Sequence, residues 1–164
     1  MKKMKRCVIV GGADINNYSF ICEKICANDY VIFCDSGLKH MTKLSIKPSL
    51  IVGDFDSFKG GLPRDIETIK LPTVKDDTDL LFAARTGVKK GFNTFLILGG
   101  YGSRPDQNFA MYSTLLWLVK SDVGVKAKAR SNGFEVTVIS DSATELFVES
   151  DEYLSVFSFG GDAV

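Results

Sequence analysis

The sequence of 164 residues has no long hydrophobic run, no excess of either charge and a single histidine. A helix that spans a bilayer needs about 20 consecutive apolar residues, and no segment approaches that length. Lys plus Arg and Asp plus Glu each total 20, so the formal net charge is zero. Nucleic-acid-binding proteins usually carry a basic excess, so we expect neither a nucleic-acid partner nor a membrane-embedded chain. The apolar stretch behind the basic N-terminus, Cys7–Val10, is too short for a signal peptide, and we expect a cytoplasmic protein.

The four cysteines are also spaced unlike a metal site or a disulfide framework. They form no CxxC pair, and His40 is the one imidazole in the chain. We therefore predict reduced thiols packed in the core, and no zinc site. We expect His40 itself to be an ordinary surface or helix-end residue.

What the sequence does contain is the composition of a packed globular domain, with 45% hydrophobic and 24% charged residues. Short β-branched runs alternate with segments of helical periodicity over the first two-thirds of the chain. This alternation predicts an α/β fold: a Rossmann-like, mostly parallel sheet with helices on both faces. The strands are expected at 7–10, 30–34, 50–52, 66–71 and 94–98, and the helices at 17–27, 38–44, from a cap at Asp77 or Thr78 to about 90, and at 104–119.

The pattern changes after about Lys120. Four short apolar segments separated by turn residues are typical of an antiparallel meander, and they lie at 125–130, 134–139, 144–148 and 153–159. Four such strands bury a face only when something packs on it. We therefore predict an α/β domain over 1–122. The pattern over 123–164 indicates an incomplete antiparallel β domain, a truncated chain or a tail that packs on a partner subunit.

Acidic residues gather where predicted strands end, which is the edge at which open α/β sheets bind ligands. Asp54 and Asp56 follow the third strand, and an extended backbone would point both carboxylates the same way, roughly 6–7 Å apart. Asp76 and Asp79 stand three residues apart at the start of a helix and share a face there. The alternative is a solvated turn at the first pair and a simple helix cap at the second.

Crowded carboxylates need a cation to offset their repulsion, which is about 4 kcal/mol for a pair 4 Å apart at an effective dielectric of about 20. Carboxylate oxygens suit a hard divalent ion, and Mg²⁺ usually completes its shell with water and phosphate oxygens. The two acidic clusters therefore predict a Mg²⁺-dependent site for a nucleotide or a phosphate ester.

A glycine-rich turn, Gly99–Gln107, joins the fifth predicted strand to the last helix. Glycines allow backbone N–H groups to approach a phosphate, and Pro105 suits the first turn of a helix. Arg104 is a candidate phosphate clamp. The alternative is a plain strand-to-helix turn in which Arg104 pairs with Asp106.

Four motifs follow one another along the chain: Asp35-Ser-Gly37, Pro48-Ser-Leu-Ile-Val-Gly-Asp-Phe-Asp-Ser57, Lys75-Asp-Asp-Thr-Asp79 and Gly100-Tyr-Gly-Ser-Arg-Pro-Asp-Gln107. In this order they resemble the thiamine pyrophosphokinase (thiamine diphosphokinase) family. The second and third motifs are highly specific together, and the resemblance covers roughly residues 7–120. The segment 153–161 resembles the start of that family's C-terminal β-sandwich domain. The resemblance thus implies a catalytic, ATP-binding α/β domain over 1–122 and the start of an incomplete antiparallel β-sandwich domain over 123–164.

The resemblance implies an enzyme that transfers the pyrophosphoryl group of ATP to the hydroxyethyl oxygen of thiamine, giving thiamine diphosphate and AMP. It also implies a homodimer, with thiamine bound between the α/β domain of one subunit and the β domain of the other. Gln107 stands where many bacterial members have histidine, so a histidine base is not expected. The implied Mg²⁺ ligands are Asp54, Asp56 and Asp79, which with Arg104 and Asp106 are the implied catalytic residues; the implied ATP-binding residues are Asp35, Ser57, Lys75, Asp76, Thr78 and Gln107.

Two other functions stay open at this point. The run Asp54-Phe-Asp-Ser57 also fits the DxDx[ST] nucleophile motif of haloacid-dehalogenase-like phosphatases, which normally follows the first strand rather than the third. The second alternative is a non-catalytic Mg-nucleotide-binding module, because the expected C-terminal domain is incomplete.

Overall fold

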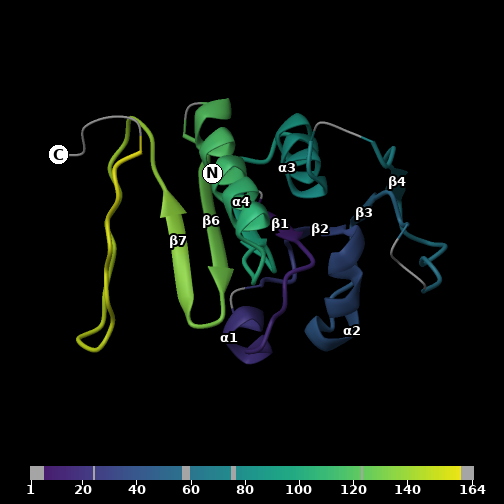
Figure 1. Ribbon diagram of the computed structural model, residues 1–164, viewed down its shortest axis with the longest axis horizontal. Helices are drawn as coiled ribbons and strands as arrows, with labels where there is room; N and C mark the ends of the chain where they lie inside the picture. Colours follow the sequence, from purple (N-terminus) through teal and green to yellow (C-terminus); the bar gives the residue numbers. More distant parts are fainter. Residues whose placement is uncertain (1–5, 24, 57–59, 75–76, 123, 160–164) are drawn as a thin grey trace.

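Seven strands form one sheet in the computed structural model, which describes residues 6–23, 25–56, 60–74, 77–122 and 124–159 (Figure 1). The strands are β1 (Arg6–Val10), β2 (Tyr30–Cys34), β3 (Leu50–Gly53), β4 (Thr68–Lys70), β5 (Thr94–Leu98), β6 (Lys126–Ser131) and β7 (Phe134–Val138). Their order in the sheet is β4-β3-β2-β1-β5-β6-β7. All neighbours from β4 to β6 are parallel, and β7 is antiparallel to β6. The predicted mostly parallel α/β fold is confirmed.

The strand order reverses at β1. The chain proceeds outward from β1 through β2 and β3 to β4, and then returns to place β5 on the other side of β1. Because these strands are parallel, the loops that follow them lie at one edge of the sheet. The junction of β1 and β5 is therefore the point at which open α/β sheets bind ligands.

Helices cover both faces of the sheet, as predicted. They are α1 (Tyr18–Cys22), α2 (Met41–Leu44), α3 (Asp79–Lys89) and α4 (Pro105–Ser121), and a 3-10 helix, η1 (Asp35–His40), leads into α2. Side chains alternate along each strand: Ile9 and Ile97 pack with α3 and α4, whereas Val8 and Leu98 pack with α1, η1 and α2. None of the described helices is long and apolar enough to cross a membrane.

Helix α1 ends five residues before the predicted end of that helix. Asn17 begins it by accepting a hydrogen bond from the Phe20 N–H at 3.1 Å. Past Cys22 the chain turns, because the Asp29 carboxylate accepts from the Cys26 N–H at 2.7 Å and the Asp29 N–H donates to the Cys26 carbonyl at 3.0 Å. Local side-chain hydrogen bonds of this kind compete with helix formation.

The predicted antiparallel meander is wrong at its first strand. Strand β6 pairs parallel with β5, from Thr94 opposite Lys126 to Leu98 opposite Arg130. Helix α4 is the crossover that a parallel pair requires. The next strand, β7, does form an antiparallel hairpin with β6. The sheet thus extends beyond the predicted domain boundary at residue 122. It includes β6 and β7, which lie in the predicted second domain.

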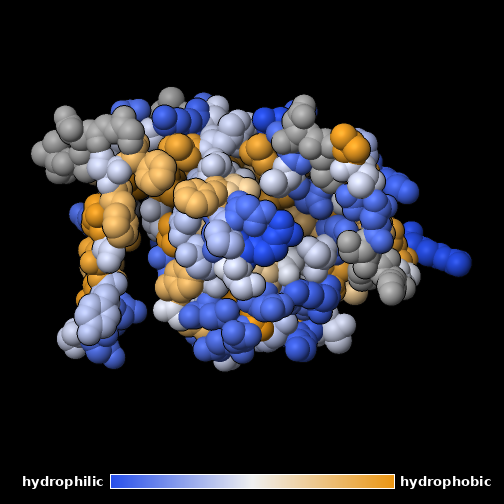
Figure 2. Space-filling model, in the orientation of Figure 1, coloured by the Kyte–Doolittle hydropathy of each residue, from blue (hydrophilic) through white to orange (hydrophobic). Residues whose placement is uncertain are grey.

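Residues 139–159, which we call the tail, leave the sheet after β7 (Figure 1). The predicted strands at 144–148 and 153–159 do not form in the described residues. The tail turns at 149–152, where the Glu152 N–H donates to the Glu149 carbonyl at 3.0 Å, and then doubles back. Its apolar side chains face outward, with Phe147 96% and Tyr153 100% exposed, and they form the hydrophobic stripe at the left of Figure 2.

Candidate active site

The ends of β2 and β3 bring Asp35 against Gly53, the residue before Asp54. Asp35 follows β2 directly, opens η1 and is 6% exposed. A Cβ at Gly53 would lie 2.5 Å from the Asp35 Cβ, and a Cβ at Gly37 would lie 2.2 Å from the Val10 carbonyl oxygen. Only glycine allows such close approaches. The glycines of the first two motifs therefore set how closely the strand ends pack.

Asp54 and Asp56 occupy a tight turn. Phe55 between them has a φ of +61°, and the Asp56 N–H donates to the Asp54 carboxylate at 3.2 Å. Asp56 also accepts from the Thr73 hydroxyl at 2.8 Å, which ties the turn to the loop after β4. The prediction of an extended segment with both carboxylates pointing the same way is therefore wrong, because this Asx turn bends the backbone. Asp54 is partly buried and Asp56 is exposed, as the alternative of a solvated turn expects.

Helix α3 begins at the same edge, after the loop that follows β4. Thr78 is its cap and accepts from the Leu81 N–H at 3.2 Å, whereas Asp77 is ion-paired with Arg85 at 2.5 Å. Asp79 is the first helical residue, and one of its carboxylate oxygens is buried. A carboxylate is favoured at that end by the helix dipole. Three predicted site residues, Ser57, Lys75 and Asp76, lie outside the described residues.

The loops after β1 and β5 are joined at the switch point. The Gly11 N–H donates to the Leu98 carbonyl and the Ala13 N–H donates to the Gly99 carbonyl, both at 2.8 Å. A Cβ at Gly11 would lie 2.6 Å from the Gly99 carbonyl oxygen. Because Gly11 and Gly99 have no side chains, the loops after β1 and β5 meet backbone to backbone at the ligand-binding edge.

The glycine turn after β5 is held by side chains from α4 and β7. The Gly102 N–H donates to the Asn108 side-chain oxygen, and the Asn108 amide donates back to the Gly102 carbonyl, each at 2.9 Å. The Tyr101 ring contacts the rings of Tyr112 and Phe134 edge-on, with centroids 5.9 and 5.0 Å apart. Burial raises the pKa of Tyr112 to about 12, with a further contribution from its hydrogen bond to Tyr101. The turn is therefore a fixed element of the site.

Arg104 pairs with Asp106, as the alternative to a phosphate clamp expects. Two nitrogens of the guanidinium donate to the two carboxylate oxygens, at 3.2 and 2.6 Å. These hydrogen bonds hold the pKa of Asp106 below its usual range and raise the pKa of Arg104. Both side chains are exposed, as is Gln107 in the first turn of α4. The pair is open to exchange with a ligand.

His40 ends a short helix, as one of the two expected alternatives has it, but it is buried and not a surface residue. It is 2% exposed and contacts Ala13 and Tyr18 through its two ring nitrogens. Burial lowers its pKa. The sequence feature that could have indicated this burial is the position of His40 in the short helix that starts with the Asp35-Ser-Gly37 motif.

The four cysteines are free thiols, as predicted. Cys7 and Cys34 are buried, and burial raises the pKa of Cys7 to about 12. Cys26 is exposed, so the expectation of a core position is wrong for that residue.

The acidic edge has the donor chemistry that Mg²⁺ prefers, since its candidate ligands are carboxylate oxygens. Among the described residues, no three His, Cys, Asp or Glu side chains come together as a ready-made metal site. Mg²⁺ is usually held by one or two protein carboxylates, and water and substrate phosphates complete its shell. The donor atoms present therefore suit Mg²⁺ chemically, but the described residues do not by themselves form a complete site.

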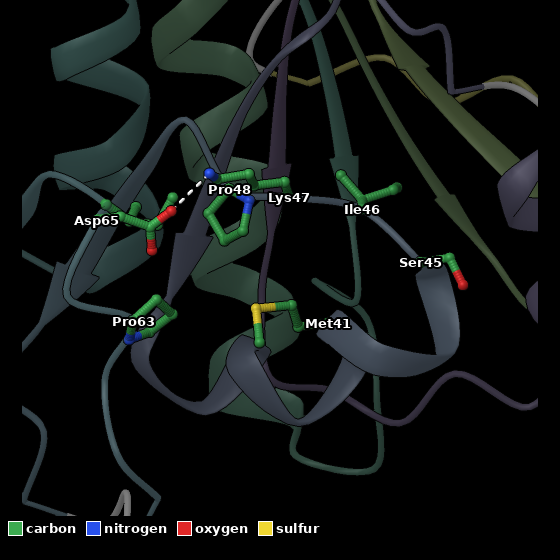
Figure 3. A pocket seen from close by; sticks show the side chains of 8 residues that line it. Met41, Ser45, Ile46, Lys47, Pro48, Pro63 and Asp65 are labelled. Atoms are coloured by element: carbon green, nitrogen blue, oxygen red, sulfur yellow. Dashed lines mark hydrogen bonds and ion pairs between the residues drawn. The ribbon is translucent and has the colours of Figure 1, made fainter.

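Two hollows have linings that include none of Asp54, Asp56 and Asp79. One of about 350 Å³ is lined by residues that precede β3 and β4, so it is at the opposite edge of the sheet; Figure 3 shows Lys47 and Asp65 paired across it, at 2.6 Å. The other, of about 290 Å³, lies beside the loop between β1 and α1. It is lined by Asp14, Ile15, Asn16, Tyr18, Lys39, His40 and Lys43.

Solved structures of known proteins share this fold. The thiamine pyrophosphokinase of Bacillus subtilis has a TM-score of 0.62 and 22% identity, over 77% of this chain and 60% of that chain. The yeast thiamin pyrophosphokinase has a TM-score of 0.58 and 15% identity, over 80% of this chain and 60% of that chain. This chain thus spans about 60% of the length of these relatives, and no curated protein matches its sequence significantly. Because residues 22–127 match the family described as "Thiamin pyrophosphokinase, catalytic domain", the chain belongs to the thiamin pyrophosphokinase family.

Proposed function

We propose that this protein is a cytoplasmic enzyme that transfers the pyrophosphoryl group of ATP to the hydroxyethyl oxygen of thiamine, giving thiamine diphosphate and AMP. The observation that carries the proposal is the sheet edge where Asp35 and the turn of Asp54 and Asp56 share one side with the glycine junction of β1 and β5. A polyphosphate needs both features: carboxylates for its cation, and an unobstructed backbone for its oxygens. The family match supplies the choice of substrates.

Mg²⁺ is assigned to Asp54, Asp56 and Asp79, with Asp35 beside them. When bound, the ion would neutralise charge that develops on the phosphate oxygens. Asp54 and Asp56 follow β3 and Asp79 opens α3, and these positions after a parallel strand and at a helix start support the assignment. Asp76 and Thr78 support this group in the proposal, Thr78 by capping the helix.

The glycine turn is assigned to the phosphates of ATP. Gly11 and Gly99 let the loops after β1 and β5 approach each other closely at the switch point, because a Cβ at either would lie 2.6 or 2.5 Å from the other's carbonyl oxygen. Arg104 is exposed, so it can exchange Asp106 for a phosphate at little cost. Ser57, Lys75 and Gln107 complete the nucleotide site by resemblance to the family.

In the proposed step, the hydroxyl oxygen of thiamine attacks the β-phosphorus of ATP. The bond from this phosphorus to the oxygen that it shares with the α-phosphate breaks, and AMP leaves with that oxygen. In this proposal the hydroxyl proton passes to one of the aspartates assigned above. Phosphoryl transfer of this kind depends mainly on positioning and on charge stabilisation, which fixed strand ends favour.

We also propose that the enzyme is a homodimer in which the second copy covers the tail. Large exposed apolar patches commonly mark contact surfaces, and the tail exposes Phe147, Tyr153 and Phe157. The thiamine site would then lie between the two copies. Light scattering should give a mass of twice 18.0 kDa, and a mass of 18.0 kDa at micromolar concentrations would contradict this proposal.

The decisive experiment measures AMP release from Mg·ATP with and without thiamine. AMP release that depends on thiamine supports the proposed reaction. A covalent phosphoaspartate trapped after incubation with a phosphate ester would instead indicate a phosphatase of the haloacid-dehalogenase type. Binding of Mg·ATP without AMP release would indicate a nucleotide-binding module.

Carboxylate variants test the assigned residues. Asp54→Asn and Asp79→Asn should each lower turnover by roughly 100- to 1,000-fold, the usual effect of losing one transition-state-stabilising group, with a much smaller effect on the free energy of unfolding. Asp65→Asn is the matched control, because Asp65 is an exposed carboxylate at the opposite edge of the sheet. Wild-type turnover in the Asp54 and Asp79 variants would overturn these assignments.

A further inference from the structure

His40 connects the acidic edge to the loop after β1. It is the last residue of η1, which Asp35 opens. Its Nε2 lies 2.9 Å from the Ala13 carbonyl oxygen, and its Nδ1 lies 2.7 Å from the Tyr18 hydroxyl. A carbonyl oxygen only accepts, so Nε2 carries the proton and the Tyr18 hydroxyl donates to Nδ1. These two contacts hold the neutral ring in one tautomer.

Ala13 connects His40 to the junction of β1 and β5. Its carbonyl accepts from His40, while its own N–H donates to the Gly99 carbonyl at 2.8 Å. The glycine turn also packs directly on Ala13, since a Cβ at Gly102 would lie 3.0 Å from the Ala13 Cβ. A displacement of Ala13 would therefore change the junction of β1 and β5.

A second anchor holds the same loop from the opposite side. Asn132, in the turn between β6 and β7, accepts from the N–H groups of Asn16 and Asn17 at 2.7 and 3.2 Å and donates to the Asp14 carbonyl at 3.3 Å. Asn132 is exposed, so water can replace these bonds. His40 is buried, so water does not easily replace its bond to Ala13.

The charges around His40 keep its ring neutral. Burial is the largest influence that lowers its pKa, and Lys39 from η1 and Lys43 from α2 act in the same direction. The hydrogen bond to the Ala13 carbonyl, the second-largest influence, raises the pKa of His40, as does the carboxylate of Asp14, which is paired with Lys39 at 2.7 Å. The groups facing the ring from the packed elements thus favour the form that donates through Nε2 alone.

We propose that His40 is a positioning residue for the polyphosphate site: by holding the Ala13 carbonyl, it sets the spacing between the loop after β1 and the glycine turn after β5. The identity of the ligand, Mg·ATP, rests on the proposed function. The contacts by which His40 holds the loop after β1 are independent of that function. His40 acts through Ala13 and is not a catalytic residue, because both of its ring nitrogens are occupied and it is buried.

Three variants of the full chain test this role. His40→Leu removes the donor, His40→Gln keeps a donor of similar reach without a titratable group, and Leu44→Ala is a destabilising control in the same buried layer. Two quantities are measured: the hydrogen-exchange rate of the Ala13 amide relative to the Ile51 amide in β3, and the Kd for Mg·ATP. The Ile51 amide reports on the sheet, because it donates to the Glu67 carbonyl at 2.9 Å.

His40→Leu should speed exchange at Ala13 and weaken Mg·ATP binding about tenfold, which corresponds to about 1.4 kcal/mol. His40→Gln should restore most of both values, and Leu44→Ala should leave both near wild type. Unchanged exchange in His40→Leu, unchanged affinity despite faster exchange, or equal effects in Leu44→Ala would each overturn the proposal. If the wild-type protein does not bind Mg·ATP, the proposed function fails, and exchange at Ala13 alone decides whether His40 holds the loop.

Discussion

The sheet and the tail are built from similar sequence and have opposite environments. The run Cys-Val-Ile-Val of β1 is buried, while the run Ser-Val-Phe-Ser-Phe of the tail is exposed. Both are short runs of β-branched or aromatic residues. The difference is that β1 has strands on both sides and helices on both faces, whereas no described strand pairs with the tail. An apolar β pattern thus becomes a strand only where neighbouring strands and a covering layer are available.

The largest expected effect compares two phenylalanines, one from each region. Phe33 is fully buried in β2 and Phe147 is 96% exposed in the tail. Phe33→Ala should lower the free energy of unfolding by about 3–5 kcal/mol, because it removes a large side chain from a packed core. Phe147→Ala should change it by less than about 0.5 kcal/mol at concentrations at which the chain is a monomer. Urea unfolding measures both, and equal losses would contradict the contrast between the regions.

An intermediate effect is expected from glycines in a tight and in an open environment. Gly37→Ala would place a methyl group 2.2 Å from the Val10 carbonyl oxygen, whereas Gly61 has no neighbouring atom within 4 Å of such a group. We expect Gly37→Ala to cost about 1–3 kcal/mol of stability and Gly61→Ala less than about 0.5 kcal/mol. Thermal or urea unfolding decides this, and a harmless Gly37→Ala would mean that η1 moves freely against β1.

The smallest expected effect is a pH dependence of the free energy of unfolding, which arises from His40 in the sheet region. Burial lowers the pKa of His40 in the folded state, below the value of about 6.5 in an unfolded chain. As the pH falls through 6.5, the unfolded chain therefore binds more protons than the folded chain, and stability falls. His40 contributes fully above pH 6.5, and its contribution is lost as the pH drops through the folded-state pKa.

His40→Gln isolates this pH contribution, because the variant does not titrate there. The difference in unfolding free energy between wild type and His40→Gln should shrink from pH 7.5 to pH 5.5. The tail has acidic residues but no histidine, so a variant of the tail such as Phe147→Ala should keep the wild-type pH dependence over this range. If the difference in unfolding free energy between wild type and His40→Gln did not change with pH, this would contradict a buried, neutral His40 ring.

Much of the sheet was predictable from local pattern. The expected strands at 30–34 and 94–98 match β2 and β5, and those at 7–10 and 50–52 match β1 and β3 to within one residue. These are continuous apolar runs that end at glycine or aspartate, as is typical of buried parallel strands. The alternation of strands and helices also predicted that the loops bearing Asp35 and Asp54 lie at one edge.

The errors fall where a distant neighbour decides the local structure. The β6 segment looks like part of a meander, but α4 carries it back to the open edge of β5, where it pairs parallel. The turn at Asp54 depends on Phe55 adopting a positive φ, which no apolar pattern indicates. His40 is buried because Ala13 and Tyr18, more than 20 residues away, provide partners for its ring nitrogens.

The sequence by itself determined the order of the motifs, the buried strands and the position of Asp35 and Asp54 at the ends of neighbouring parallel strands, because each follows from short-range periodicity and from parallel strand direction. The tertiary structure decided the orientation of those carboxylates, the contact between the loops after β1 and β5, the burial of His40 and the exposure of the tail. These depend on contacts between residues far apart in the chain, whose energies depend on the packed three-dimensional arrangement rather than on local sequence.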